Sequence, residues 1–386
     1  MLDFDYQAET RILFGKDKIK GIAGEIKKYS ARVLLVYGKG SIKTNGIHQE
    51  LVSILNENKI SFNELSGIEP NPKISSVRQG IALCRVHELD FILAVGGGSV
   101  IDCAKAIACG VYSEKDPWDF FIKKSEIIKA LPIGVILTLS ATGSESNGFS
   151  VISNKDTEEK LGIGHDILKP KFSILDPSYT FTVSSKQSAY GVVDIYSHLL
   201  EQYFSPEKGT FLQDRLAESL MKTCIHYGAK VLTKPNNYEF RAQLMWASSL
   251  SLNGLLSCGK TGDWSTHFIE HAVSAVYDIA HGLGLAIITP YWMEYVLGAK
   301  DSGKFADYGR NVFSLQGQDD AAIGRDAIEQ TKAFFKSLGL PSRLKDVGVE
   351  EGSLGQMAKK ATKFGSIGSY SKLDTNDVYE ILKTAY

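Results

Sequence analysis

Residues 91–108 read FILAVGGGSVIDCAKAIA, and this stretch decides the fold. Its first five residues are all apolar, which is typical of a strand that is buried on both faces. The turn Gly96–Ser99 follows, and residues 100–108 then have the pattern of a helix. A buried strand that passes through a glycine turn into a helix is the repeating unit of a parallel α/β sheet.

The rest of the first half repeats this alternation. Further strands are predicted at 33–37, 61–65 and 133–137, and further helices at 46–58 and 74–87. From about residue 184 the strand pattern stops, and helices are predicted at 189–203, 210–233, 238–256, 264–277, 284–297, 320–338 and 375–386. We therefore expect an α/β domain over residues 1–183, with a doubly wound, Rossmann-like parallel sheet, and an all-α domain over residues 184–386.

Three predicted strands end in turns rich in glycine or hydroxyl side chains, at residues 38–41, 96–99 and 138–144. Glycine lets the backbone approach a phosphate, and the N-terminus of a following helix offers unpaired N–H groups. One GGGS turn alone is also compatible with a plain tight turn, because it is neither a GxGxxG nor a GK[ST] motif. The carboxyl ends of parallel strands share one edge of the sheet, so three such turns together predict a dinucleotide site.

The composition is that of an ordinary globular protein. A formal net charge of -1 gives no reason to expect a nucleic-acid partner, and no apolar run is long enough to span a membrane. The 5 cysteines include no CxxC pair, which favours reduced thiols over disulfides. The opening MLDFDYQAETRILFG is acidic and polar, unlike a secretory signal. We expect a cytoplasmic protein, and a homodimer as the commonest assembly.

Five residues of the second half have the spacing of a metal site. Asp194 and His198 are four positions apart, and His267 and His271 repeat that spacing, so each pair shares one face of a helix. His281 follows ten residues later, at an expected helix end or loop. At most four ligands are needed, so one of the five is expected to be a neighbour of the metal or a catalytic residue. One carboxylate with three imidazoles suits catalytic Fe²⁺ or Zn²⁺, and the alternative is a set of buried, hydrogen-bonded histidines.

Taken together, these motifs resemble the iron-containing (group III) alcohol dehydrogenase family, and within it the branch of butanol dehydrogenases and broad-range aldehyde reductases. The similarity covers nearly the whole chain. Its segments are RILFGKDKI, GGGSVIDCAKAIA, TLSATGSESNGFSVIS, DPSYTFT and the two metal segments. The resemblance implies a dehydroquinate synthase-like architecture, with a dinucleotide-binding domain followed by a helical one.

The resemblance also implies roles for individual residues. The implied metal ligands are Asp194, His198, His267 and His281. His271 matches an extra histidine on the substrate side, which makes it the candidate catalytic proton relay. The implied cofactor residues are Gly38, Gly40 and Ser41 in the first turn, Gly97, Gly98, Ser99 and Asp102 at the pyrophosphate, and Thr138, Thr142, Lys160 and Tyr179 at the phosphates, ribose or nicotinamide.

The implied reaction is hydride transfer between a nicotinamide and a small alcohol or aldehyde such as butanol, with Fe²⁺ or Zn²⁺ as Lewis acid. NAD-preferring relatives place an acidic residue in the loop that corresponds to residues 38–41. This chain has none there, and Lys39, Ser41 and Lys43 are compatible with a 2′-phosphate. The sequence therefore predicts NADP(H) in preference to NAD(H).

Three alternatives remain. A glycerol- or polyol-type dehydrogenase of the same superfamily differs only in its substrate. A dehydroquinate-synthase-like lyase needs basic residues around the metal, and residues 261–281 contain no lysine or arginine. A non-enzymatic module predicts lost ligands, whereas all four are present.

Overall fold

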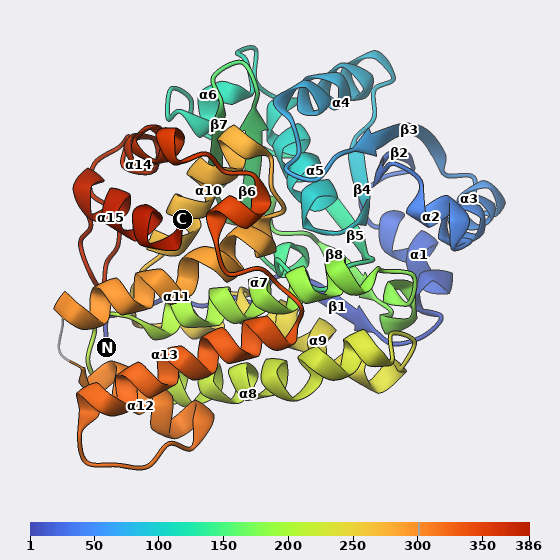
Figure 1. The fold of residues 1–386 in the computed structure, drawn as a ribbon. Helices are drawn as coiled ribbons and strands as arrows, with labels where there is room; N and C mark the ends of the chain where they lie inside the picture. Colours follow the sequence, from blue (N-terminus) through green and yellow to red (C-terminus); the bar gives the residue numbers. More distant parts are fainter. Residues whose placement is uncertain (300–301) are drawn as a thin grey trace. The chain divides into compact units, whose positions relative to one another are not determined.

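The protein, described here by a computed structural model over residues 1–299 and 302–386, forms two compact units (Figure 1). The sheet unit contains Gln7–Val183 and Pro235–Asn253, and the helical unit contains Met1–Tyr6, Ser184–Lys234 and Gly254–Tyr386. The chain passes from the sheet unit into the helical unit between residues 183 and 184, where the sequence predicts the domain boundary. Two segments depart from the predicted division, because the N-terminal six residues belong to the helical unit and residues 235–253 belong to the sheet unit.

The sheet unit is built on a parallel sheet, as the sequence predicts. The sheet has six strands, and four of them lie at the predicted positions near residues 33–37, 61–65, 91–95 and 133–137. In spatial order the six strands are β1 (Arg11–Phe14), β8 (Phe172–Leu175), β5 (Ile133–Leu137), β4 (Phe91–Gly96), β2 (Arg32–Gly38) and β3 (Ser61–Ile68). An antiparallel hairpin, β6 (Phe149–Asn154) and β7 (Glu159–Gly164), lies in the connection from β5 to β8 and was not predicted.

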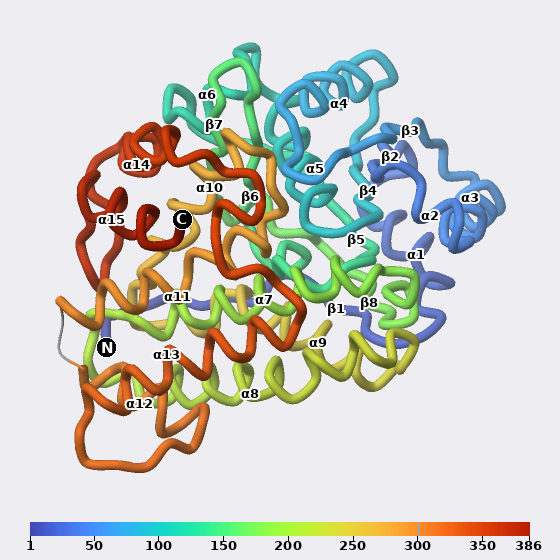
Figure 2. The backbone as a smooth tube through the Cα atoms, in the orientation of Figure 1, coloured from blue at the N-terminus to red at the C-terminus, as the bar shows by residue number. Residues whose placement is uncertain are grey.

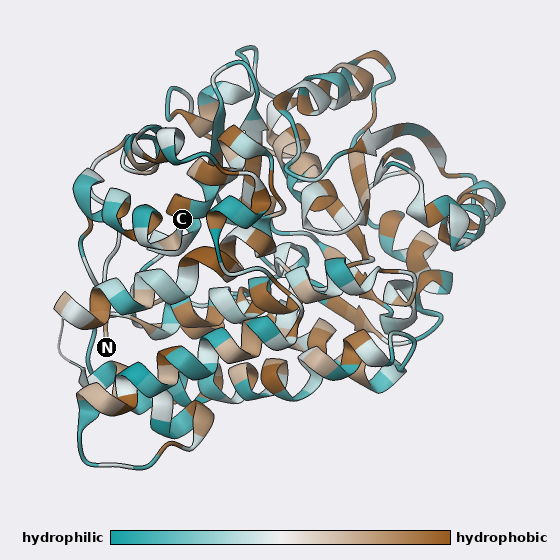
Figure 3. Ribbon diagram, in the orientation of Figure 1, coloured by the Kyte–Doolittle hydropathy of each residue, from teal (hydrophilic) through white to brown (hydrophobic). Residues whose placement is uncertain are grey.

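Side chains of the central strands alternate between two cores, one on each face of the sheet. Val33 and Leu35 of β2 belong to the core that also contains residues of α1 and α3, whereas Leu34 and Val36 belong to the core of α4, α5 and α6. These helices are α1 (Ile22–Ile26), α2 (Ser41–Thr44), α3 (Ile47–Glu57), α4 (Ile74–Val86), α5 (Gly98–Gly110) and α6 (Trp118–Phe121). Because both faces are covered, the central strands β4 and β5 are buried and apolar, and the middle of the sheet is brown in Figure 3.

Helix α9 (Tyr238–Ser251) completes the sheet unit. Its Met245 is fully buried in the core of α4 and α5, and its Trp246 ring contacts that of Phe14 on β1 at a centroid distance of 6.2 Å. The Ser249 hydroxyl donates to the carboxylate of Glu145, which is fully buried. These contacts explain why α9 belongs to this unit although helices of the other unit precede and follow it in sequence.

The helical unit is organised around α7 (Ser185–Tyr203). Every residue from Gly191 to Tyr203 is buried, and α8 and α11 run beside it (Figure 2). The unit's helices are α7, α8 (Phe211–Thr233), α10 (Ser265–Tyr277), α11 (His281–Ala299), α12 (Gly303–Phe313), α13 (Asp320–Ser337), α14 (Leu354–Ala361) and α15 (Thr375–Ala385).

The predicted helical character of this part is confirmed, although α12 and α14 were not predicted and α11 begins at His281, three residues before the predicted start. Among residues 1–299 and 302–386, no helix is both long and apolar enough to cross a membrane.

Candidate metal centre and dinucleotide site

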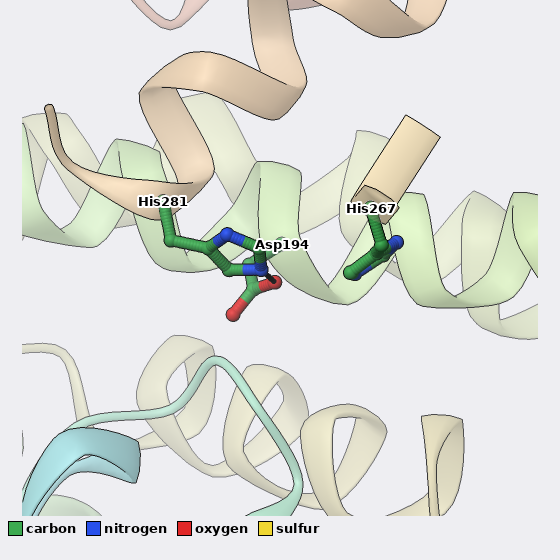
Figure 4. Close-up of side chains that lie close together, drawn as sticks. All are labelled: Asp194, His267 and His281. Atoms are coloured by element: carbon green, nitrogen blue, oxygen red, sulfur yellow. Dashed lines mark ion pairs between the residues drawn. The ribbon is translucent and has the colours of Figure 1, made fainter. Parts of the chain in front are cut away.

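Three helices of the helical unit bring a carboxylate and two imidazoles together. Asp194 lies on the buried helix α7, His267 on α10, and His281 is the first residue of α11. One ligand atom from each lies within 4.8 Å of the others, so a single ion could contact all three. The Nε2 of His281 is 3.5 Å from Oδ1 of Asp194, and Figure 4 shows this ion pair with His267 beside it. The structure thus gathers three of the four predicted ligands in one cluster.

His198, the fourth predicted ligand, lies next to this cluster without belonging to it. It is one turn along α7 from Asp194, and its Nδ1 is 3.7 Å from Oδ1 of that residue. Its ring is stacked on the ring of His267, with centroids 4.7 Å apart and an angle of 26° between the planes. Burial and the neighbouring imidazoles hold the pKa of His198 well below its usual value. The imidazole is therefore neutral at pH 7, which is the form that binds a metal.

A buried carboxylate orients the ring of His267. Glu201 of α7 accepts a hydrogen bond from Nδ1 of His267 at 3.1 Å and another from its backbone N–H at 3.0 Å. It also accepts one from the hydroxyl of Thr266. Because Nδ1 is engaged, Nε2 of His267 is the nitrogen available to a metal.

A second carboxylate acts on His281 in the same way. Glu270 of α10, whose side chain is fully buried, accepts a hydrogen bond from Nδ1 of His281. It also accepts one from the hydroxyl of Ser274. The Nε2 of His281 consequently points toward Asp194. Metal-ligating histidines commonly donate their second N–H to a carboxylate in this way.

The donor atoms of this cluster fit a divalent cation. In the part of the chain that the structure describes, Nε2 of His267 and Nδ1 of His198 are buried and make no hydrogen bond. A buried nitrogen without a partner is costly, and a metal ion would satisfy it. The buried carboxylates of Asp194, Glu201 and Glu270 also favour a positive charge nearby. One oxygen and three nitrogens form a set that suits Fe²⁺ or Zn²⁺.

His271, the predicted catalytic residue, lies on the same helix as His267. Its ring centroid is 5.5 Å from that of His281 and 6.3 Å from that of His267. A ligand atom of His271 also lies within 4.8 Å of ligand atoms of Glu270 and His281. The side chain is partly exposed, unlike that of His267. This position is compatible with proton transfer between solvent and the cluster.

The predicted cofactor residues all belong to the sheet unit. Strand β2 has β3 on one side and β4 on the other, although β3 and β4 are consecutive in sequence. The strand order therefore reverses at β2 and β4, and dinucleotides bind at such a point, beyond the carboxyl ends of the strands. Gly38 ends β2, Gly40 precedes α2, and Ser41 is the first residue of α2. Gly97 precedes α5, which contains Gly98, Ser99 and Asp102.

The turn after β4 is packed tightly against the loop after β5. A Cβ on Gly98 would lie 2.4 Å from Cγ2 of Thr142, so only glycine fits at this position. Asp102 accepts a hydrogen bond from the Ser144 hydroxyl at 2.6 Å and another from the backbone N–H of Val151 at 2.9 Å. Hydrogen bonds and close packing thus join helix α5 to residues 138–151 around the predicted pyrophosphate turn.

The other predicted cofactor residues lie on separate elements of the same unit. Thr138 directly follows β5, and its N–H donates to the Gly96 carbonyl at 3.0 Å. Lys160 is buried on β7. Tyr179 lies in the 3₁₀ turn Pro177–Thr180 after β8, where burial raises the pKa of its hydroxyl.

Sequence reasoning did not identify Glu201 and Glu270, which orient two of the imidazoles. The signal is present in the sequence, because both segments contain the pattern His-x-x-Glu, as His198–Glu201 and His267–Glu270. Each glutamate lies three residues after a candidate ligand, and each holds an imidazole on another helix. The aromatic residue Trp264, whose ring lies 5.4 Å from that of His267, was also missed.

Two family models match the chain. "Iron-containing alcohol dehydrogenase" matches residues 9–177, and "Fe-containing alcohol dehydrogenase family, C-terminal" matches residues 188–386. The chain is 54% identical to NADH-dependent butanol dehydrogenase A of Clostridium acetobutylicum, with 100% of both proteins covered. It is 40% identical to the NADPH-dependent aldehyde reductase YqhD of Escherichia coli, with 95% of this chain and 94% of YqhD covered.

A solved structure has the same fold. The crystal structure of NADH-dependent butanol dehydrogenase A from Thermotoga maritima matches with a TM-score of 0.96 at 40% sequence identity, and 100% of this chain and 99% of that one are covered. This match and the family models confirm the predicted combination of a parallel-sheet unit and a helical unit. The chain belongs to the iron-containing alcohol dehydrogenase family, in its branch of butanol dehydrogenases and aldehyde reductases.

Proposed function

We propose that this alcohol dehydrogenase interconverts short primary alcohols and aldehydes, and that it binds a catalytic Fe²⁺ or Zn²⁺ through Asp194, His198, His267 and His281. The observation that carries the proposal is the cluster of Asp194, His267 and His281 within 4.8 Å, in which Asp194 and His267 are buried, with His198 stacked on His267. When bound, the metal supplies Lewis-acid polarisation of the substrate oxygen and the nicotinamide supplies the hydride. The names of the relatives, which include butanol dehydrogenases and an aldehyde reductase, support the substrate class.

The chain's own residues then have distinct tasks. Glu201 and Glu270 keep the Nε2 atoms of His267 and His281 directed at the ion by holding their Nδ1 atoms. His271 is the proposed proton relay, since it is a partly exposed imidazole that is not one of the four proposed ligands. In the sheet unit, the turn at Gly97 and Gly98 is proposed to hold the pyrophosphate at the N-terminus of α5.

The metal part of the proposal is tested on chelated protein that is reconstituted with Fe²⁺, Zn²⁺ or Mg²⁺ alone. Turnover of C2 to C8 aldehydes with NADH and NADPH is then measured. We expect activity to return with Fe²⁺ or Zn²⁺ and to stay absent in Asp194→Asn, which keeps the shape of the side chain but loses its charge. His226→Ala on the surface of α8 is the matched control and should behave as wild type. Full activity in the chelated protein or in Asp194→Asn would refute the metal site.

The same screen determines the substrate class. A preference for butanal and its neighbours over hydroxyaldehydes is expected, and the opposite preference would favour the polyol-type alternative. The two classes differ in polar groups that a site must hydrogen-bond, so the discrimination between them is expected to be large.

For the cofactor, we propose that the chain uses both NADPH and NADH, with a modest preference for NADPH. The prediction of NADPH depended on Lys39 and Lys43 and on the lack of an acidic residue at 38–41. The structure places an acidic residue near each lysine. Lys39 forms an ion pair with Glu69 at 2.9 Å. Lys43 lies over the ring of Tyr37, and the hydroxyl of Tyr37 donates a hydrogen bond to Glu64. These carboxylates offset the lysines, so the preference should not exceed about tenfold. The names of the relatives include both cofactors.

Glu69→Gln tests the cofactor argument. It frees Lys39, and the ratio of kcat/KM for NADPH to that for NADH should rise severalfold at low ionic strength. Raising the salt concentration should reduce this difference because both side chains are largely exposed. An unchanged ratio, or a wild-type preference for NADH above tenfold, would contradict the proposal.

We also propose a cytoplasmic homodimer. All 5 cysteines are buried free thiols, which supports a reducing compartment. Symmetric dimers are the commonest assembly of soluble enzymes. Light scattering coupled to size-exclusion chromatography measures the mass, and a monomer of 42.3 kDa would contradict the assembly.

A further inference from the structure

Trp264 has a backbone conformation that aromatic residues rarely adopt. Its φ of 67° and ψ of 4° lie in the left-handed region, directly before the first residue of α10. An L-residue with a bulky side chain is strained there, so the surrounding structure must hold it. Strained residues of this kind cluster at active sites and ligand-binding sites.

Asp263 anchors the backbone on the N-terminal side of Trp264. Its Oδ1 accepts the N–H of Ser265 at 3.1 Å, and its Oδ2 accepts three successive N–H groups of a distant loop, at 2.9 to 3.2 Å. That loop is Ser369–Ser371. The N–H of Asp263 donates to the carbonyl of Glu201 at 2.8 Å. The residue before Trp264 is thereby fixed to α7, to α10 and to the C-terminal loop.

Gly262 provides the space for the indole. A Cβ on this glycine would lie 2.6 Å from Nε1 of Trp264 and 3.1 Å from the carbonyl oxygen of Glu201. The indole therefore lies directly on the backbone of residue 262. Together, Gly262 and Asp263 leave the Trp264 side chain little freedom to turn away; we call these two residues the Gly-Asp clamp.

The clamped indole lies against two of the proposed metal ligands. Its centroid is 5.4 Å from that of His267, with the planes at 70°, and 6.3 Å from that of His198, with the planes at 58°. These two imidazoles come from different helices and stack on each other. The ring of His267 is fixed by Glu201, whereas for His198 the structure gives ring contacts with Trp264 and His267 and an approach to Asp194.

We propose that Trp264 is a positioning residue of the metal centre: its indole, held by the Gly-Asp clamp, keeps the imidazoles of His198 and His267 in the orientation that binds the ion. A tryptophan that only fills space does not require a strained, left-handed backbone. At this position the left-handed backbone accompanies contacts of the indole with both the His198 and His267 rings. The inference rests on the proposed metal site.

The test measures metal binding rather than turnover. Apo-protein is titrated with Co²⁺, and affinity is obtained by competition with a chelator, while the visible d–d spectrum reports the ligand geometry. In Trp264→Ala we expect Co²⁺ affinity to fall about 10- to 100-fold, the range for residues that orient metal ligands, with a changed spectrum. Trp264→Phe keeps an aromatic ring and should restore affinity to within a few-fold. The control is Trp246→Ala on the exposed surface of α9.

A second measurement does not depend on the stability of the alanine variant. Bound Co²⁺ should quench the fluorescence of Trp264, and the quenched component should vanish in Trp264→Phe while the remaining tryptophans report a folded protein. Asp263→Asn weakens the clamp and should alter the Co²⁺ spectrum in the same direction as Trp264→Ala.

The outcomes separate the two proposals. If Co²⁺ binds wild type and Asp194→Asn equally, the proposed metal site itself is refuted. If it binds wild type more tightly than Asp194→Asn, and Trp264→Ala has the affinity and spectrum of wild type, the positioning role is overturned and the metal site stands.

Discussion

The carboxylate of Glu201 on α7 holds the Nδ1 atom of His267 on α10 at 3.1 Å. The bond joins two helices that are more than sixty residues apart in sequence, and it leaves only Nε2 of the imidazole for a metal. Glu201 is 2% exposed, so its negative charge acts on the ring without screening by water. In the proposed metal site, the glutamate therefore makes Nε2 the nitrogen that binds the ion and raises its basicity.

Replacing Glu201 should therefore weaken metal binding without removing a ligand. We expect Glu201→Gln to lower Zn²⁺ affinity by about tenfold and Glu201→Ala by up to about 100-fold, because glutamine keeps a hydrogen-bond acceptor and alanine does not. Chelator competition measures both values. Glu294→Gln, at an exposed position on α11, is the control. Equal Zn²⁺ affinities in wild type, the control and both Glu201 variants would show that the Glu201–His267 hydrogen bond has no effect on metal binding.

His271→Ala tests the proton relay. We expect the metal to be retained while kcat falls by about 100-fold or more, which is the usual contribution of a general acid or base. The part of the pH dependence of kcat that reflects titration of the His271 imidazole should disappear. Metal content and the pH dependence of kcat are measured on the same preparation. Near-normal turnover with an unchanged profile would rule out the relay.

Gly98→Ala tests the pyrophosphate turn. The added methyl group would meet Thr142 at 2.4 Å, so the turn or the neighbouring loop must move. We expect the dissociation constant for NADPH to rise more than tenfold, while the Zn²⁺ affinity of the helical unit stays unchanged. The control is Gly24→Ala in α1, where the methyl group meets nothing within 4 Å. Cofactor fluorescence titration gives the constants, and equal values for both variants would remove the turn from the cofactor site.

Lys105 gives a prediction for pH. Its ammonium is fully buried on α5 and donates to Ser144, Asn147 and the Phe149 carbonyl. Burial lowers the pKa of Lys105 from 10.5 to about 8. Between these two values the unfolded chain binds a proton that the folded protein lacks, so this group's contribution to the free energy of unfolding rises as the pH rises from 8 to 10.5.

Lys105→Met should make this dependence visible. At pH 7 the variant should be less stable than wild type by about 1 to 3 kcal/mol, because buried acceptors lose their donor. The difference should widen by up to about 3 kcal/mol as the pH rises to 10, since only wild type gains stability in this window. Urea denaturation of the two proteins from pH 7 to 10 gives the difference. A constant difference would show that Lys105 does not titrate there.

Much of the fold was predictable because the central strands carry an unmistakable pattern. Strands β2, β4 and β5 are apolar on both faces, and a glycine- or hydroxyl-rich turn follows each of them. Strands β1 and β8 were missed because each has only four residues, and β1 also lies at the edge of the sheet with its residues exposed or partly exposed. The β6–β7 hairpin was missed because its serines, glycines and charged residues obscure the apolar alternation.

The candidate site was predictable to the extent that it depends on helical spacing. Four positions separate Asp194 from His198 on α7, and the structure places both near His267 and His281. The pattern His-x-x-Glu marks Glu201 and Glu270, but it does not show that they are buried or which imidazole each one holds, because that depends on how three helices pack. The acidic partners of Lys39 and Tyr37 were hidden for the same reason, since they come from β3 and the loop that follows it.

The position of α9 has a consequence for recombination between relatives. A chimaera that joins residues 1–183 of one homologue to residues 184–386 of another would contain a sheet unit with mixed parents. Its strands would come from the first homologue and its helix α9 from the second. The Glu145–Ser249 hydrogen bond and the Phe14–Trp246 ring contact would then join residues that did not evolve together. A crossover scheme that preserves both cores needs three further junctions, near residues 6, 234 and 253, so that each compact unit is inherited whole.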